Sequence, residues 1–366
     1  MTDNHLEIVV SSETLQRQTR AILAAWGAPP EHVEIISRCM HESDLRGIDS
    51  HGVGMFPTYE QHLERGAIHM QPDIRVVHDD AATALIDADH SLGHVPASMA
   101  MDLACDKAAA FGIGMVAVRN SNHYGAAGVY SSMAAERGLI GVSTTGTSQR
   151  SVVPTFAREP RFSTNPIAFS APAGRNPEFC LDMATSTVAV GKVNIARRAG
   201  KPLPDGWALT PEGRPEHDAA AAYHSKPKRL TPLGGSRDLG SHKGYGLAML
   251  VEILSSVMTD SFVGGHDPKT WEQERYINVG HCMMAIDPNR FGLQGSFADR
   301  MDRLIDMLHD TPRADQNQPV LVAGDPEHAA RAERVANGIP MVATLVAEVR
   351  DVARRAGAEV VLPEPG

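Results

Sequence analysis

The chain has 366 residues, of which 42% are apolar and 21% charged, a composition typical of folded globular proteins rather than disordered ones. It carries 34 Lys and Arg against 44 Asp and Glu, and the resulting net charge of −10 argues against nucleic acid as a partner. At roughly 150 residues per domain, this length favours two domains.

The sequence favours neither a membrane nor an oxidising compartment. Its most apolar stretch, residues 244–258, is interrupted by Glu252 and is too short to cross a bilayer. The first residues lack the basic start and apolar run of a secretory signal. The four cysteines are scattered without a CxxC pair, as in reduced proteins. We therefore expect a cytoplasmic protein with no membrane partner.

Two helices are predicted at the N-terminal end. Ser12 is the expected N-cap of the first, which ends at Gly27 and the prolines that follow. The second begins near Glu31 and runs toward Asp44, with apolar side chains recurring on one face.

The middle of the chain alternates between strands and helices. Residues 97–111 and 125–137 have helical patterns, and residues 114–118 and 139–144 read as short buried strands. This order predicts an α/β unit with a buried sheet. Residues 196–242 contain Gly, Pro and charge without periodicity, which predicts surface loops.

The last third returns to helices. An apolar helix is expected at residues 245–258 and a strand at residues 278–286. Three further helices follow, at residues 296–309, 326–336 and 343–356. The simplest domain map has a helical domain from both chain ends, residues 1–75 and 295–366, and an inserted α/β domain of residues 76–294. The expected fold class is therefore α/β (α+β).

No glycine-rich dinucleotide fingerprint stands in the expected context. Residues 112–117 match its letters but follow a helix and enter a strand, where such a motif does not work. His242 and Lys243 instead open the apolar helix, where free N–H groups and the helix dipole attract anions. The alternative is a solvated lysine before a buried helix.

Two of the seventeen histidines lie on predicted loops in surroundings typical of a functional site. His51 follows the second helix in RGIDSHGV, and His123 follows a strand in NSNHYG. A neutral imidazole on such a loop suits acid–base chemistry, although either ring could simply bond a carbonyl. His90 and His94 are four residues apart, but their loop-like, Gly-containing surroundings do not favour a shared helix face, so no metal site is expected.

Asp182 ends a predicted strand in LDMATS, followed by small polar residues. Its carboxylate could orient a histidine or bind a cofactor hydroxyl. The alternative, favoured by the local pattern alone, is that it caps the following helix.

Six motifs in order resemble one family: RGIDSHGV, NSNHYGAAG, STNPIAF, LDMATS, SHKGYGLAMLVEIL and ANGIP. The sequence resembles the malate/L-lactate dehydrogenase family, which also contains L-sulfolactate, ureidoglycolate and 2,3-diketogulonate oxidoreductases. The resemblance implies a non-Rossmann, L-sulfolactate-dehydrogenase-like fold and a homodimer. It also implies hydride transfer between NAD or NADP and a small 2-hydroxy or 2-oxo acid, or a cyclic imino acid.

The resemblance also implies roles for single residues. His51 corresponds to the family's proton donor, and His123 to a proton acceptor of the ureidoglycolate branch. Thr164 is expected near nicotinamide or substrate. The positions expected to bind the cofactor are Asp182, Met183, Ala184, Thr185, Ser186, Thr187, His242, Lys243, Gly324, Asp325 and Pro326.

One departure concerns the substrate. Many relatives carry an arginine four residues after the SHG histidine, suited to a carboxylate, and here that residue is Met55. Either Arg46 takes this role or the substrate differs from simple malate or lactate. The sequence does not distinguish NAD from NADP.

Two other function classes remain open. The many His and Asp residues leave room for a metal-dependent hydrolase or lyase. Met55 leaves room for an inactive family member that only binds a ligand.

Overall fold

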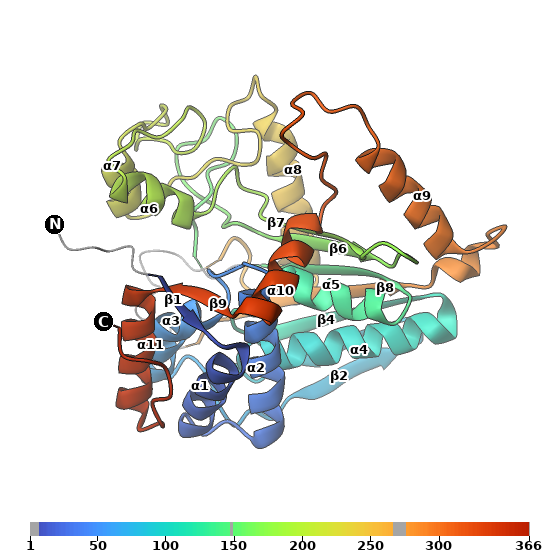
Figure 1. The fold of residues 1–366 in the computed structure, drawn as a ribbon, viewed down its shortest axis with the longest axis horizontal. Coiled ribbons are helices and arrows are strands. Elements are labelled where there is room, and N and C mark those ends of the chain that lie inside the picture. Colours follow the sequence, from blue (N-terminus) through green and yellow to red (C-terminus); the bar gives the residue numbers. More distant parts are fainter. Residues whose placement is uncertain (1–6, 147–148, 266–275, 366) are drawn as a thin grey trace.

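A seven-stranded sheet forms the centre of the protein (Figure 1). The computed structural model describes residues 7–146, 149–265 and 276–365, so most of the segment on which the secretory-signal expectation rests lies outside it. In spatial order the strands are β2 (Arg75–Asp80), β3 (Thr83–Asp87), β4 (Ile113–Ser121), β8 (Val279–Ile286), β5 (Ile140–Thr145), β6 (Ile167–Ala171) and β7 (Phe179–Met183). β3 and β4 are parallel, and the other neighbours are antiparallel.

Two helices, α4 (His94–Phe111) and α5 (Ala127–Glu136), pack on the sheet. Glycines in the strands let them approach closely. A Cβ at Gly114 of β4 would lie 2.1 Å from the Ala104 carbonyl oxygen, and one at Gly141 of β5 would lie 2.2 Å from that of Ser131. Larger residues would push the helices off the sheet.

The two ends of the chain build a second core. Helices α1 (Ser12–Ala25), α2 (Pro30–Leu45), α3 (Phe56–Glu64) and α11 (Ala343–Ala356) contribute its buried apolar side chains. β1 (Glu7–Val10) pairs antiparallel with β9 (Ile339–Val342) and ties the ends together. The prediction that both ends fold together agrees with this packing, while the domain boundaries stay a prediction.

The sequence pattern predicts Ser12 as the N-cap of α1, but the structure has Ser11 in that position. The Ser11 hydroxyl accepts the Thr14 N–H from an extended backbone, whereas Ser12 already lies inside the helix. The prediction was therefore wrong by one residue.

A third, smaller core lies between α6 (Val190–Arg198) and α7 (Ala219–His224), above the sheet in Figure 1. α7 falls inside the segment predicted as loops. Its alanine run favours a helix, and the Asp218 side chain accepts the N–H groups of Ala220 and Ala221 at its start. The all-loop prediction was wrong there.

The remaining helices are α8 (Ser241–Glu252), α9 (Phe297–His309) and α10 (Asp325–Asn337). A single π-helical turn, η2 (Ile253–Val257), continues α8 and packs against β8 and β5. α9 is held by Asp302, whose carboxylate accepts N–H groups from residues 174–176. Among the described helices none is both long and apolar enough to span a bilayer.

Candidate active site

The rings of His51 and His123 lie side by side. Their centroids are 5.4 Å apart and the planes are inclined by 26°. His51 comes from the turn between α2 and α3, and His123 from the loop between β4 and α5. Burial lowers the pKa of both imidazoles, that of His123 well below its usual range. Near neutral pH this pair is therefore uncharged.

A buried carboxylate shapes the turn that carries His51. Asp44 of α2 accepts the Val53 N–H through both oxygens, at 3.3 and 3.2 Å. A Cβ on Gly52 would lie 1.8 Å from Asp44 Oδ1, so the turn fits only glycine there. The hydroxyl of Ser50 lies 2.8 Å from His51 Nδ1 and fixes one edge of the ring.

His123 is held from the other side of the site. Its Nδ1 lies 2.8 Å from the hydroxyl of Tyr59 on α3 and accepts the Gly125 N–H at 3.3 Å. Tyr59 belongs to the core of the chain ends, and His123 lies on the loop that follows β4 of the sheet. This contact therefore joins the two cores at the histidine pair.

Three more histidines surround the pair and are also held neutral. Burial lowers the pKa of His62 to about 4 and those of His94 and His281 to about 3. His281 hydrogen-bonds to hydroxyls of Ser121 and Thr145, whereas neither ring nitrogen of His94 has a hydrogen-bond partner among the described residues. The site is thus a compact group of uncharged imidazoles.

His90 and His94 are separated in the fold. His90 stacks on the Tyr276 ring with centroids 4.2 Å apart, while His94 meets the edge of Tyr59. In the part of the chain that the structure describes, no three His, Cys, Asp or Glu side chains gather as a metal site would require.

Asp182, at the end of β7, caps an earlier helix. Its Oδ2 accepts the Gly128 N–H of α5 at 2.7 Å, whereas the local pattern favoured a cap on the helix that follows. Burial raises the pKa of this carboxyl to about 6, against the effect of the hydrogen bond. Its Oδ1 has no hydrogen-bond partner among the described residues and is available to a ligand.

The hydroxyls that follow Asp182 are already used as donors within the chain. Thr185 donates to the Thr164 carbonyl at 3.0 Å, Ser186 to that of Val188 at 2.9 Å, and Thr187 to that of Pro232 at 2.7 Å. The Thr187 oxygen also accepts the Thr231 hydroxyl at 3.0 Å. Met183 and Ala184 lie half-buried between Asp182 and these residues.

His242 and Lys243 occupy the first turn of α8 and are both exposed. The left-handed Gly240 precedes the helix, with φ of 96°. The Lys243 ammonium has no hydrogen bond or ion pair within residues 7–146, 149–265 and 276–365. This helix terminus is therefore open to an anion.

Gly324, Asp325 and Pro326 form the start of α10. Gly324 is left-handed, with φ of 105°, and Pro326 lies in the first turn. The Asp325 carboxylate accepts the Val322 N–H at 2.7 Å and lies 2.8 Å from Nε2 of His309. The expected cofactor residue is thus engaged by α9.

Neither residue considered for the substrate carboxylate offers a free charge. Arg46 is buried, donates to Glu42 at 2.9 Å and lies 3.8 Å from Glu178. Met55 packs against the core of the chain ends. The half-buried Thr164 has its carbonyl bonded to Thr185.

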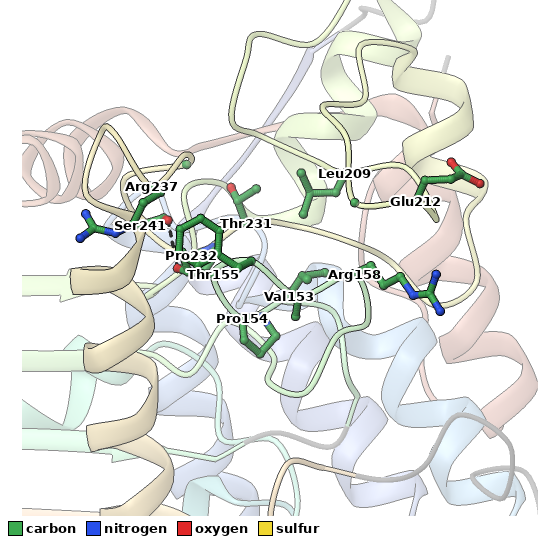
Figure 2. Close-up of a pocket in the computed structure, with 14 residues that line it drawn as sticks. Val153, Pro154, Thr155, Arg158, Leu209, Glu212, Thr231, Pro232, Arg237 and Ser241 are labelled. Carbon is green, nitrogen blue, oxygen red and sulfur yellow. Dashed lines mark hydrogen bonds between the residues drawn. The ribbon is translucent and has the colours of Figure 1, made fainter.

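A pocket of about 550 Å³ lies beside the predicted cofactor residues (Figure 2). Its lining includes Pro232, whose carbonyl oxygen accepts a hydrogen bond from the Thr187 hydroxyl, and Ser241 at the start of α8. Figure 2 shows the Ser241 hydroxyl hydrogen-bonded to that of Thr155, which also lines the pocket, and the two oxygens are 3.0 Å apart. The pocket therefore adjoins α8, and the histidine pair does not line it.

Four further residues position the two histidines and are not among those expected from the sequence: Asp44, Ser50, Tyr59 and Gly125. Ser50 is adjacent to His51 and could have been proposed from the motif. Gly125 lies two residues after His123 and could also have been proposed from its motif. Asp44 acts on Val53 nine residues along the chain, and Tyr59 lies 64 residues before His123, so no local pattern reports these two contacts.

Comparison with known proteins places this geometry among dehydrogenases. Residues 10–350 match the family model described as malate/L-lactate dehydrogenase. A malate dehydrogenase of Pyrococcus abyssi is 38% identical over 337 residues, covering 92% of this chain and 91% of that protein.

Two solved structures are similar over nearly their whole length. Sulfolactate dehydrogenase of Methanocaldococcus jannaschii has a TM-score of 0.85 at 32% identity, covering 96% of this chain and 98% of that one. The delta1-piperideine-2-carboxylate reductase of Pseudomonas syringae pvar. tomato has a TM-score of 0.82 at 30% identity, covering 94% and 100%. The expected fold is confirmed.

Proposed function

Because this chain belongs to the malate/L-lactate dehydrogenase family, we propose that it is a nicotinamide-dependent oxidoreductase of small 2-hydroxy or 2-oxo acids, or of cyclic imino acids. The observation that carries this proposal is the pairing of His51 and His123, whose rings lie side by side although one loop follows α2 and the other follows β4. Hydride transfer to the carbon–oxygen or carbon–nitrogen double bond of the substrate needs a proton donor near the oxygen or nitrogen, placed so that it does not obstruct the hydride. Two neighbouring imidazoles can provide that donor and hold the substrate.

The residues around the site fit NAD or NADP. The exposed start of α8 with Lys243 suits a phosphate, because its N–H groups and ammonium are all donors. Asp182 keeps one carboxylate oxygen free, as a ribose hydroxyl requires. When bound, the nicotinamide supplies or accepts the hydride at C2 of the substrate.

The chain itself must move a proton. In the oxidising direction, the neutral His51 accepts the proton of the substrate hydroxyl at Nε2, while Ser50 holds Nδ1. In the reducing direction the same nitrogen returns a proton to the oxygen. Since the surrounding imidazoles are uncharged, the site presents no competing fixed charge to that proton.

Turnover of a substrate panel tests the proposal. Malate, lactate, sulfolactate, their oxo acids and cyclic imino acids are assayed with NAD(H) and NADP(H) separately. We expect turnover of at least one substrate with at least one cofactor. Nicotinamide binding without any turnover would favour an inactive member, an alternative motivated by Met55, which stands where many relatives carry an arginine. Bound zinc or manganese without nicotinamide binding would favour a hydrolase or lyase.

We also propose a cytoplasmic homodimer. The four cysteines are unpaired and buried, as expected in a reducing compartment. Apolar side chains lie exposed along α8 and η2, among them Leu250, Ile253 and Val257, and a second copy of the chain would cover them. Sedimentation of the wild type and of Ile253→Glu tests this, with the dimer expected only for the wild type.

A further inference from the structure

We propose that Tyr59 is a positioning residue that, with the backbone N–H of Gly125, fixes His123 as its Nε2–H tautomer. His123 then donates a hydrogen bond to the substrate oxygen and does not carry the proton. This inference rests on the proposed function, because it assigns a role to a histidine of that same site.

The tautomer follows from which groups can donate. The Gly125 N–H can only donate, and it points at His123 Nδ1 over 3.3 Å. Nδ1 must therefore present a lone pair, and a neutral ring then carries its proton on Nε2. The Tyr59 hydroxyl, 2.8 Å from the same nitrogen, must be a second donor.

Both donors are held firmly in place. Tyr59 is 1% exposed, and burial raises the pKa of its phenol far above the usual range, so its hydroxyl keeps the proton. Gly125 has a φ of 79°, and a Cβ there would lie 3.0 Å from His94 Nε2. Only glycine can therefore bring this N–H to His123 without strain.

The same contacts oppose protonation of His123. A proton on Nδ1 would face the Gly125 N–H, which cannot turn into an acceptor. The rings facing His123 from other elements, those of His51, His62, His94 and His281, would add repulsion as they gain charge. The imidazolium of His123 is thus disfavoured from both sides.

His51 is held differently, and the difference separates the two roles. Its Nδ1 faces the Ser50 hydroxyl, which can donate or accept. The ring can therefore gain and lose a proton without losing its partner. The half-buried ring of His123 has no hydrogen bond at Nε2 within the described residues, so its N–H is available to the substrate.

Nitrogen-15 NMR of histidine-labelled full-length protein tests the tautomer without substrate or cofactor. The His123 signals are assigned as those missing from His123→Asn. We expect an unprotonated Nδ1 and a protonated Nε2 at neutral pH in the wild type. In Tyr59→Phe the Nδ1–H form should become detectable. An Nδ1–H ring or an imidazolium in the wild type would overturn the inference.

Kinetics test the positioning role. We expect Tyr59→Phe to raise the KM of the substrate about tenfold, the worth of one buried hydrogen bond, with a smaller loss of kcat and unchanged nicotinamide affinity. Tyr124→Phe is the matched control, because it removes a buried hydroxyl whose hydrogen-bond partner is Ser143 and not His123, and should leave KM and kcat unchanged. Equal losses in both variants would contradict a specific role for Tyr59.

The two tests also separate this inference from the proposed function. If the wild type binds no nicotinamide, the proposed function fails, yet the NMR result still decides the tautomer. If the wild type turns over but His123 carries Nδ1–H, the positioning role fails alone.

Discussion

The ring of His51 lies in a group of neutral, largely buried imidazoles, whereas Lys243 at the start of α8 is exposed and charged. The first region depends on close packing and on the direction of hydrogen bonds. A Cβ on Gly52 or a change at Ser50 disturbs it directly. The second depends on charge acting through water, which salt screens. We infer that changes at the histidines alter the chemical step or substrate binding, and changes at α8 alter cofactor affinity.

The largest expected effect is at the proton carrier. His51→Ala should lower kcat by at least about 10²-fold with little change in nicotinamide affinity, because general acid–base catalysis is lost. His123→Ala should raise KM more than it lowers kcat, as loss of substrate binding does. Steady-state kinetics and cofactor titration measure both. Exchanged phenotypes would exchange the roles, and no effect on kcat in either variant would refute the acid–base proposal.

The packing around His51 is tested at Gly52. Gly52→Ala places a methyl group against the buried Asp44 carboxylate and should lower the free energy of unfolding by about 2 kcal/mol, with reduced kcat. Gly191→Ala is the control, since a Cβ there meets nothing within 4 Å, and should be neutral or slightly stabilising. Equal stability of the two variants in urea unfolding would show that the turn accommodates a methyl group at residue 52, and would contradict the packing argument.

Asp182 gives a pH signature in the unliganded protein. Because its folded pKa of about 6 exceeds the ordinary value of 3.8, the folded state binds its proton more tightly, and stability falls as pH rises from 4 to 6. Asp182→Asn should remove this loss, which is on the order of 3 kcal/mol above pH 6. Unfolding at pH 4 and pH 8 checks this. A difference between variant and wild type that does not change with pH would contradict it.

The smallest effect is expected at the exposed lysine. Lys243→Met should weaken nicotinamide binding about threefold to tenfold at low salt, with less effect at high salt. The exposed Lys226→Met is the control and should leave affinity unchanged. Titration at two ionic strengths provides the measurement. A salt-independent loss would mean that Lys243 acts through packing and not through charge.

The sequence predicts the elements that have a local pattern and misses those that depend on contacts with other parts of the chain. α4, α5, β8 and α11 lie close to their predicted positions, because each has a local apolar pattern and, in places, a glycine stop. β2 escaped prediction because all six of its residues are exposed and show no alternation. β1 escaped because it is defined by pairing with β9 at the other end of the chain.

The candidate site divides in the same way. His51, His123 and Lys243 were singled out because their local surroundings are unusual. The stacking of the two histidines, the cap that Asp182 provides for α5, and the bond from Tyr59 could not be predicted. These contacts arise only when separate segments pack, and single-sequence patterns carry no record of that packing.

Transfer of deuterium from nicotinamide tests the central claim most directly. The protein is incubated with NADH or NADPH carrying two deuteriums at C4 and with the best oxo or imino acid of the panel. The account predicts one deuterium at C2 of the product, where it does not exchange with water. Product that forms without deuterium, or without consumption of the nicotinamide, would contradict it.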